Sequence, residues 1–333
     1  MTNYFKIENR RYIGAKTKLL DWIFDNLPLE DIGSVADIFA GSGVVAQKFI
    51  ANSNANKIII NDFLYSNKVI YQAFFKGDKA DFKELENIKQ YCNEAIQTVA
   101  NYFSDNFADT YFSYNDCLKI GSIREYISKA NFSQNIENIL LASLIYSMDK
   151  VANTVGHYDA YIKQKKPIDK FKFELIRPIK SEKTIEIYKR DANELSKNIK
   201  ADLFFIDPPY NSRQYSRFYH IYENLVKWEK PKLSGVALKP KEENMSEYCK
   251  VSASKSFSDL IENLDCKYIA VTYNNTYASK SSSSKNKISY EQLKTILSKK
   301  GQLYVKERPY SYFNAGKTAL LNHKEFLFFV DVK

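Results

Sequence analysis

Short apolar runs that end at acidic or glycine-containing turns recur along the chain, with amphipathic stretches between them. A short apolar run bounded by turn residues predicts a buried strand, whereas apolar residues every three or four positions predict a helix. We therefore expect strands at 34–39, 57–61, 184–189, 202–206, 267–273, 302–308 and 325–331. Expected helices occupy 17–27, 43–51, 134–150, 216–228 and 289–299, with further helices in 64–103. Strands that alternate with helices in this way indicate an α/β fold with a mostly parallel sheet.

The middle of the chain differs from its two ends. It begins with helical patterns rich in Tyr, Phe, Lys and Glu, and its last part, 151–182, is polar, aromatic and basic. At 333 residues the chain exceeds the size at which a single hydrophobic core usually stops growing. We therefore predict one α/β domain formed by 1–75 and 183–333, with 76–182 inserted as a mainly helical region. Residues 281–284, four serines flanked by lysines, are expected to form a surface loop.

The charge balance favours a polyanionic partner, because 49 basic residues against 39 acidic ones give a net charge of +10. Four scattered cysteines and three isolated histidines predict neither a disulfide framework nor a metal site. The polar N-terminus does not resemble a signal peptide, and no apolar run approaches the length of a membrane span. We accordingly expect a cytoplasmic protein with no membrane or metal partner.

The most informative motif is Asp207-Pro208-Pro209-Tyr210, which follows a short apolar run. Two successive prolines fix φ and remove two backbone donors, so they end the strand in a rigid turn. Open α/β sheets bind their ligands at this end of a strand. A carboxylate, carbonyl oxygens and an aromatic face suit an exocyclic amino group on a flat ring. For an isolated tetrapeptide, a purely structural turn is an equal alternative.

A second motif combines a strand, a glycine turn and a helix, and residues 37–43 read Asp-Ile-Phe-Ala-Gly-Ser-Gly. Gly41 and Gly43 would let the backbone approach a ligand, and the following helix N-terminus offers free N–H groups. The motif lacks the third glycine of the dinucleotide fingerprint and the lysine of a phosphate loop, which disfavours a pyrophosphate ligand. Asp62 ends the next apolar run about 20 residues on, where an acid either holds a ribose diol or caps a turn.

Three segments, in this order, resemble those of the S-adenosylmethionine-dependent DNA adenine-N6 methyltransferases with the Dam-like motif order. They are residues 11–16, which read Arg-Tyr-Ile-Gly-Ala-Lys, then residues 37–43 and residues 207–210. The resemblance covers both ends of the chain and is vague in the middle. It implies a Rossmann-like methyltransferase fold, in which a mostly parallel seven-stranded sheet ends in an antiparallel pair.

The resemblance also implies roles for individual residues. Asp207 and the Pro208 carbonyl would accept the two N–H bonds of an adenine amino group, while Pro209 stiffens the turn and Tyr210 stacks on the ring. Lys16 would pair with the cofactor carboxylate, Asp62 would hold its ribose, and Asp191 would bind its adenine amino group. The other residues expected to line the cofactor pocket are Tyr12, Gly14, Asp37, Phe39, Gly41 and Gly43. Asp37 could equally brace the glycine turn.

The basic middle segment, together with two arginines after the tetrapeptide, is expected to contact double-stranded DNA. Its lysines would face phosphates, its tyrosines would stack or act as wedges, and the arginines would pin the phosphates beside an extruded nucleotide. These residues are Lys163, Lys165, Lys166, Tyr158, Tyr161, Arg213 and Arg217. The alternatives are a solvated lysine face and arginines paired with acids on the next helix.

These features predict a site-specific DNA methyltransferase that acts on adenine N6, uses S-adenosylmethionine, and has a possible partner restriction endonuclease for the same site. An RNA adenine or guanine methylase would share the cofactor site and the tetrapeptide. A protein glutamine methylase would favour Asn at position 207. A catalytically silent nucleic-acid-binding protein on the same fold would require neither Asp207 nor the glycine turn.

Overall fold

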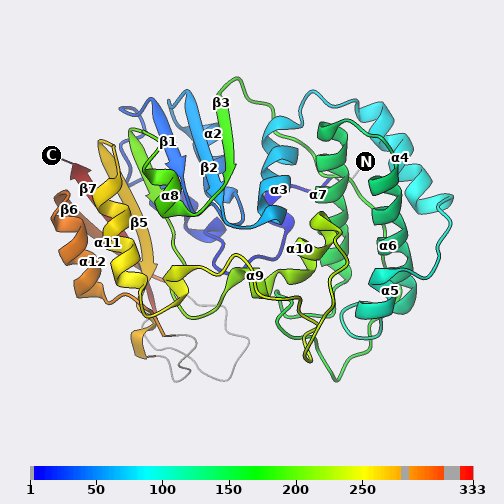
Figure 1. The fold of residues 1–333 in the computed structure, drawn as a ribbon. Helices are drawn as coiled ribbons and strands as arrows, with labels where there is room; N and C mark the ends of the chain where they lie inside the picture. The colour runs from blue at the N-terminus through cyan, green and yellow to red at the C-terminus, as the bar shows by residue number, and fades with distance from the viewer. Residues whose placement is uncertain (1–3, 279–284, 311–322, 333) are drawn as a thin grey trace. The chain divides into compact units, whose positions relative to one another are not determined.

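A computed structural model describes residues 4–278, 285–310 and 323–332, and the chain divides into two compact units (Figure 1). The first, here called the sheet unit, comprises Lys16–Phe63, Glu182–Tyr215 and Asn244–Lys333. The second, here called the helical unit, comprises Met1–Ala15, Leu64–Ser181 and Ser216–Glu243. None of the helices in the described ranges is long and apolar enough to cross a membrane.

Seven strands form a single sheet in the order β3-β2-β1-β4-β5-β7-β6. Strands β1 to β5 run parallel to one another, and β7 runs antiparallel to both β5 and β6. The bounds are β1 Ser34–Asp37, β2 Lys57–Asp62, β3 Thr184–Lys189, β4 Leu203–Ile206, β5 Tyr268–Asn274, β6 Gly301–Pro309 and β7 Lys324–Val332. The predicted mostly parallel seven-stranded sheet with an antiparallel pair at its end is confirmed.

Helices cover both faces of this sheet because successive side chains of a strand point to opposite sides. Phe205 of β4 packs edge-on against Phe49 of α2, with the ring centroids 6.1 Å apart. Its neighbour Phe204 belongs instead to the core formed with Phe257 and Leu260 of α11. The helices of the sheet unit are α1 Leu20–Phe24, α2 Val44–Asn52, α8 Ala192–Ser196, α11 Ala253–Asn263 and α12 Tyr290–Ser298. Short 3-10 turns occupy Thr17–Leu19, Glu247–Cys249 and Thr276–Ala278.

The helical unit is built around α7, which packs against α3 and α6, while α10 packs against α3 and α7. Side chains at the N-terminal caps start several of these helices, for example Asp81 before α4 and Ser133 before α7. The bounds are α3 Tyr65–Lys76, α4 Phe82–Glu94, α5 Tyr102–Phe107, α6 Tyr114–Lys129, α7 Gln134–Val151 and α10 His220–Lys227. A 3-10 turn occupies Ile7–Asn9, and α9, Tyr215–Phe218, begins at the last residue of a sheet-unit segment.

The unit boundaries differ from the predicted domain boundaries. The helical unit begins at Leu64 rather than at residue 76, and it also takes in Met1–Ala15 and Ser216–Glu243. The reason is packing, because α3 buries its apolar face against α7 and α10 of the same unit. Helices α6, α8 and α11 were not predicted, and the predicted helix 216–228 is divided between α9 and α10. The expected loop at 281–284 lies outside the described residues.

Candidate active site

The carboxylate of Asp207 lies immediately after β4 and is held by three side chains. Its Oδ2 pairs with the Lys16 ammonium at 2.8 Å. Its Oδ1 accepts hydrogen bonds from Thr272 Oγ1, at 2.7 Å, and from the Tyr210 hydroxyl. The Asp207 side chain is 19% exposed and that of Lys16 only 5% exposed. The structure therefore fixes the orientation of this carboxylate while leaving part of it accessible.

The turn that carries Asp207 is also fixed by its backbone. The carbonyl of Tyr210 accepts hydrogen bonds from the Lys287 N–H at 2.8 Å and from the Tyr273 hydroxyl at 3.2 Å. Gln214 and Ser246 exchange two further bonds, of 2.9 Å and 2.7 Å, between the segment after the turn and the segment before α11. Pro208 and Pro209 have no N–H to donate within the Asp207–Tyr210 turn. The turn is rigid because their rings fix φ.

Lys16 carries the positive charge of this cluster. Burial opposes that charge, but the carboxylates of Asp207 and Glu325 raise the pKa of Lys16 above its usual value. Its ammonium lies 5.0 Å from the centroid of the Tyr210 ring, a cation–π distance. The resemblance implied that Lys16 pairs with a cofactor carboxylate, whereas in this structure its ion pair is with Asp207.

The glycine turn follows β1 and begins with a buried acid. Gly41 and Gly43 have φ of +52° and +83°, conformations that favour glycine, and Gly43 is the N-terminal cap of α2. Asp37 is 1% exposed, and neither of its oxygens makes a hydrogen bond of normal geometry within the described chain. Burial, Asp207 and Asp62 raise the pKa of Asp37 well above its usual value, and the nearby Ala46 N–H opposes this only in part.

The two other predicted cofactor acids follow neighbouring strands. Asp62 ends β2, and its Oδ2 accepts the Gly41 N–H at 2.9 Å, so it supports the glycine turn directly. Asp191 follows β3 and caps α8, where its Oδ1 accepts N–H bonds from Asn193 and Glu194. Asp62 and Asp191 therefore both accept hydrogen bonds from the backbone in this structure. For Asp62 this agrees with the alternative that it caps a turn.

Asn61 joins the ends of three strands, and sequence reasoning missed it. Its side-chain amide donates to the Ile38 carbonyl after β1 and to the Arg190 carbonyl after β3, both at 3.0 Å. Its side-chain oxygen accepts the Arg190 N–H at 3.0 Å. This buried amide fixes the spacing between the glycine turn and Asp191. A polar residue inside the otherwise apolar run 57–61 was the available signal.

Phe39 lies half-buried in the turn after β1, where its ring meets the buried Tyr248 edge-on at 5.0 Å. The Tyr248 hydroxyl donates to Asn193 Oδ1 at 2.7 Å, next to the Asp191 cap. Phe39 is thus packed on the same side of the glycine turn as the α8 N-terminus.

Tyr12 and Gly14 belong to the helical unit. The Tyr12 ring stacks on Tyr219, with centroids 4.7 Å apart and an interplanar angle of 8°. The Tyr219 hydroxyl accepts the Ile13 N–H at 2.8 Å, and Gly14 has φ of +82°. Tyr219, which is not among the predicted site residues, therefore holds Tyr12 and Ile13 of the N-terminal motif in place.

Three of the predicted DNA-contacting lysines, Lys163, Lys165 and Lys166, are exposed on one loop of the helical unit. Asn153 anchors this loop, because its side-chain amide donates to the carbonyls of Ile162 and Lys165 at 3.0 Å. Within the described ranges, none of the three lysines makes an ion pair. Their ammonium groups are therefore available for an anion.

The predicted role of Tyr158 as a stacking or wedging residue is corrected by its position in the core of the helical unit. Its side chain is 1% exposed, and its hydroxyl donates to Asp149 Oδ1 at 3.3 Å. Its ring packs edge-on against that of Tyr222, so no face is open to a base. Tyr161 is half-buried and contacts Tyr111 edge-on at 5.3 Å.

The two arginines belong to different units. Arg213 lies in the sheet unit, where its N–H donates to Asn211 Oδ1 at 3.1 Å and its carbonyl accepts from the Cys249 thiol. Arg217 lies in the helical unit and donates to the Pro240 carbonyl at 2.7 Å. The adjacent His220 is buried, which lowers its pKa to about 4, and its Nδ1 lies 3.0 Å from the Arg217 carbonyl. His220 therefore has a local packing role.

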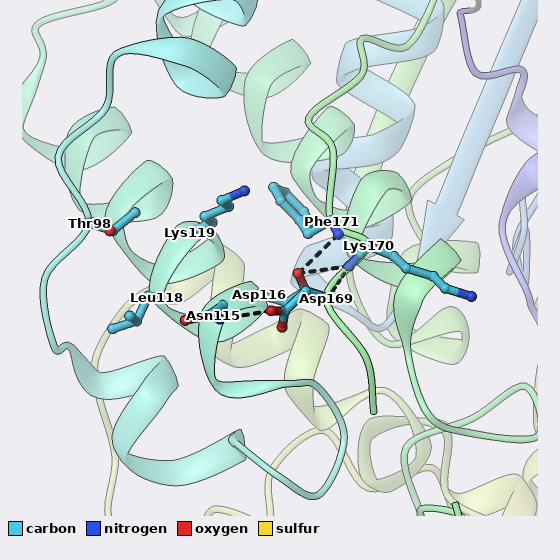
Figure 2. Close-up of a pocket in the computed structure, with 8 residues that line it drawn as sticks. All are labelled: Thr98, Asn115, Asp116, Leu118, Lys119, Asp169, Lys170 and Phe171. Atoms are coloured by element: carbon cyan, nitrogen blue, oxygen red, sulfur yellow. Dashed lines mark hydrogen bonds between the residues drawn. The ribbon is translucent and has the colours of Figure 1, made fainter. Parts of the chain in front are cut away.

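A pocket of about 430 Å³ in the helical unit contains none of the predicted site residues (Figure 2). Asp116 lies at its floor, and its carboxylate accepts the backbone N–H groups of Lys170 and Phe171 at 3.0–3.2 Å. Asn115 donates to Asp169 beside it, at 2.8 Å. These acids are satisfied by their neighbours, which indicates a structural role for them.

The acids and glycines of the sheet unit gather at one edge of the sheet. The parallel strands β1 to β4 bring Asp37, Asp62, Asp191 and Asp207 to their carboxyl ends, which is the ligand-binding edge of an open α/β sheet. Both oxygens of the buried Asp37 carboxyl lack a hydrogen-bond partner. A cofactor with an ammonium group and hydroxyl groups would supply the missing donors. No group of histidine, cysteine or acidic side chains suited to a metal ion is found among the described residues.

Comparison with known proteins shows the family of this chain. The family model of the D12 class N6 adenine-specific DNA methyltransferases matches residues 12–303. The chain belongs to this family.

Type II methyltransferase M.CviAII of Paramecium bursaria Chlorella virus 1 is 31% identical over 97% of this chain and 98% of that protein. Type II methyltransferase M.NlaIII of Neisseria lactamica is 29% identical over 94% of this chain and 95% of that protein. Modification methylase LlaI of Lactococcus lactis is 30% identical, over 80% of this chain and 46% of that protein. Among the alternatives raised by the sequence, this family selects DNA adenine methylation.

Proposed function

We propose that this protein transfers the methyl group of S-adenosylmethionine to N6 of an adenine that has swung out of duplex DNA, at one recognition sequence. The observation that carries the proposal is the Asp207 carboxylate, held by Lys16 and Thr272 at the carboxyl end of β4. Family membership provides the reaction class, and this carboxylate provides a group that can bind the amino group of the base.

Asp207 and the Pro208 carbonyl would act on the amino group of adenine. The N6 lone pair is delocalised into the ring, which makes this nitrogen a weak nucleophile. Two N–H bonds, to the Asp207 carboxylate and the Pro208 carbonyl, would draw the nitrogen toward tetrahedral geometry and stabilise the positive charge that develops on it. The Thr272 and Tyr210 hydroxyls hold the carboxylate in one orientation before the base arrives. Such preorganisation removes the cost of reorienting these dipoles during the reaction.

Tyr210 would stack on the extruded base. Swinging a nucleotide out of the helix costs a few kcal/mol, which stacking and hydrogen bonds at the Watson–Crick edge must offset. The bond between the Tyr210 hydroxyl and Asp207 fixes the ring relative to the carboxylate. A base lying on this ring would therefore present its amino group toward Asp207.

The cofactor would lie along the carboxyl edge of the sheet unit, where it supplies a methyl group already activated by its sulfonium charge. The proposed contacts in the sheet unit are Lys16, Asp37, Phe39, Gly41, Gly43, Asp62 and Asp191. Tyr12 and Gly14 stay predicted cofactor contacts. Asp62 supports this assignment by bonding to the Gly41 N–H, since one acid can then hold both the glycine turn and a ribose hydroxyl.

Asp62→Ala tests the cofactor site separately from the chemistry. It should weaken S-adenosylmethionine binding at least about tenfold, because it removes a charged hydrogen-bond acceptor and loosens the turn. Calorimetric titration with the cofactor measures this. Asp21→Ala, which removes an exposed acid of α1 paired with Lys48, is the control and should bind normally. An unchanged affinity in Asp62→Ala would remove Asp62 from the site.

The exposed loop with Lys163, Lys165 and Lys166 supports DNA binding by the helical unit, because phosphate contacts of this kind position a protein on the duplex. Tyr161, Arg213 and Arg217 are proposed as further DNA contacts. The relatives named as type II methyltransferases support a place in a restriction–modification system, with a cognate endonuclease acting on the same sequence. The cytoplasm, where such DNA is found, is the proposed location.

The decisive experiment is expression in a host that lacks DNA methylation, followed by sequencing of its genome for N6-methyladenine. We expect one modified sequence motif, and the purified protein should transfer labelled methyl groups to duplex DNA containing it. The same motif in RNA serves as the control substrate and should remain unmodified. A host genome without N6-methyladenine, together with no transfer to duplex DNA, would reject this function.

A further inference from the structure

Glu325 of β7 lies on the same face of the sheet as Thr272, one of the residues that hold Asp207. Glu325 pairs in register with Asn274 of β5, two residues after Thr272. Directly opposite residues of an antiparallel pair point to one side of the sheet, and residues two apart on a strand do so as well. The Thr272 hydroxyl donates to Asp207 at 2.7 Å. Strand pairing therefore places a second carboxyl on the face that carries the Asp207 cluster.

Glu325 is a buried acid with an unsatisfied oxygen. The residue is 6% exposed, and its Oε2 has no hydrogen-bond partner within the described residues. Burial raises its pKa to about 7, the Lys16 ammonium opposes the rise, and Asp207 adds to it. Tyr210 and Tyr310 are the other ionisable groups that interact with it, Arg308 lies opposite it on β6, and His323 lies two residues before it in the chain.

A purely structural role does not account for this arrangement. A buried carboxyl with one oxygen that lacks a hydrogen-bond partner destabilises the fold, and an amide or an apolar side chain would pack there at lower cost. Buried acids with perturbed ionisation that lie beside a specific charge partner cluster at functional sites. Lys16 is the nearby cation: its ion pair in this structure is with Asp207, and the carboxylates of Asp207 and Glu325 both raise its pKa.

We propose that Glu325 is a positioning residue that competes with Asp207 for the Lys16 ammonium. Ionised Glu325 attracts Lys16, which frees Asp207 Oδ2 to accept an N–H bond from the base. Protonated Glu325 leaves Lys16 on Asp207, where the 2.8 Å ion pair occupies that oxygen. The step requires only the loss of one proton from Glu325 to water. The inference rests on the proposed role of Asp207 and adds a second acid to the same site.

Single-turnover transfer at saturating cofactor and duplex DNA, measured from about pH 6 to about pH 9, tests this inference. The wild-type rate should rise with pH through one ionisation near neutrality. Glu325→Gln cannot ionise, so its rate should remain about tenfold below the wild-type plateau and should not show that rise. Glu325→Asp keeps an ionisable carboxyl and should restore the rise at a lower plateau.

Glu307→Gln is the matched control. Glu307 lies on β6, its side chain is 55% exposed, and it pairs with Lys324. This variant should keep the wild-type profile. A wild-type profile without an ionisation near neutrality would overturn the inference even if Glu325→Gln does not fold. A Glu325→Gln rate and profile like those of the wild type, or identical profiles for the Gln and Asp variants, would overturn it as well.

The same assay separates this inference from the function on which it rests. Absence of transfer by the wild type would reject the proposed function and the inference with it. Full transfer by Asp207→Ala would reject the role of Asp207. Transfer by the wild type that is lost in Asp207→Ala but unaffected in Glu325→Gln would reject the inference alone.

Discussion

The buried carboxylates of the two units differ in how they are satisfied. In the helical unit, Asp149 accepts the Tyr222 hydroxyl at 2.7 Å and the Arg11 N–H at 2.8 Å. Glu223 accepts the N–H groups of Tyr65 and Ser66 at the start of α3. Each oxygen of these two acids has a protein donor, so burial is compensated within the fold.

In the sheet unit, two buried acids have oxygens without a hydrogen-bond donor. Neither oxygen of Asp37 and only one oxygen of Glu325 finds a partner among the described residues. Both acids belong to the set around Asp207, at the carboxyl end of the parallel strands. The comparison indicates that a buried acid supports the fold when all its oxygens accept hydrogen bonds. A buried acid with an oxygen that lacks a donor is instead suited to bind a ligand or to change its partner.

The largest effect should come from Asp207→Ala. Loss of an acceptor that stabilises charge in the transition state should reduce methyl transfer at least about 10²–10³-fold, while S-adenosylmethionine binding changes little. Rapid-quench transfer assays and calorimetric titration measure the two quantities. Asp202→Asn, at the opposite end of β4, is the control and should transfer normally once folded, because its carboxylate binds the backbone of Gly33 and Ser34. A large loss of cofactor affinity in Asp207→Ala would contradict its assignment to the base.

Asp149→Ala should have the next largest effect, and that effect should fall on stability. Removal of the carboxylate leaves the Tyr222 hydroxyl buried without an acceptor and takes away the acceptor of the Arg11 N–H, which costs about 3 kcal/mol of unfolding free energy. Urea denaturation measures the change. Asp105→Ala, an exposed position on α5, should be nearly neutral. If both variants unfold at the same urea concentration, Asp149 does not support the helical unit.

Glu325→Gln should change how stability depends on pH. The folded-state pKa is raised from 4.5 to about 7, so the protonated carboxyl stabilises the fold. That contribution is complete below about pH 4.5 and is lost as the pH rises through about 7. Glutamine stays neutral, so the unfolding free energy of the wild type should fall relative to the variant by roughly 3 kcal/mol between about pH 4 and about pH 8. Denaturant titrations at several pH values measure this, and parallel curves would show that Glu325 is not buried as described.

The smallest effect should come from replacing Lys163, Lys165 and Lys166 with glutamine. Each lysine that contacts a phosphate releases counterions, so the slope of log affinity against log salt should fall by about 2–3. Fluorescence anisotropy with a labelled duplex measures the slope. The matched control replaces three lysines around α11 and α12 in the sheet unit, Lys255, Lys294 and Lys299. An unchanged slope in the first variant would place the DNA surface elsewhere.

The strand that ends at Asp207 and the glycine turn at 41–43 could be predicted from the sequence because both signals are local. Four apolar residues, then Asp207 and two prolines, define where β4 ends, and Gly41 and Gly43 adopt positive φ in the predicted turn. The order of acids along the chain also predicted which strand ends carry Asp62 and Asp191. Their roles toward a ligand stay predictions, because the structure shows only their backbone partners.

Tertiary structure alone decided which distant side chains complete the cluster. Thr272 and Glu325 lie 65 and 118 residues from Asp207, inside strands whose apolar pattern gives no sign of the contact. Tyr158 shows the same limit, because an aromatic residue in a basic segment looks exposed until Asp149 and Tyr222 are found around it. Periodicity reports which face of an element is buried. Which partner covers that face depends on pairings between segments far apart in the chain, and only the folded structure contains them.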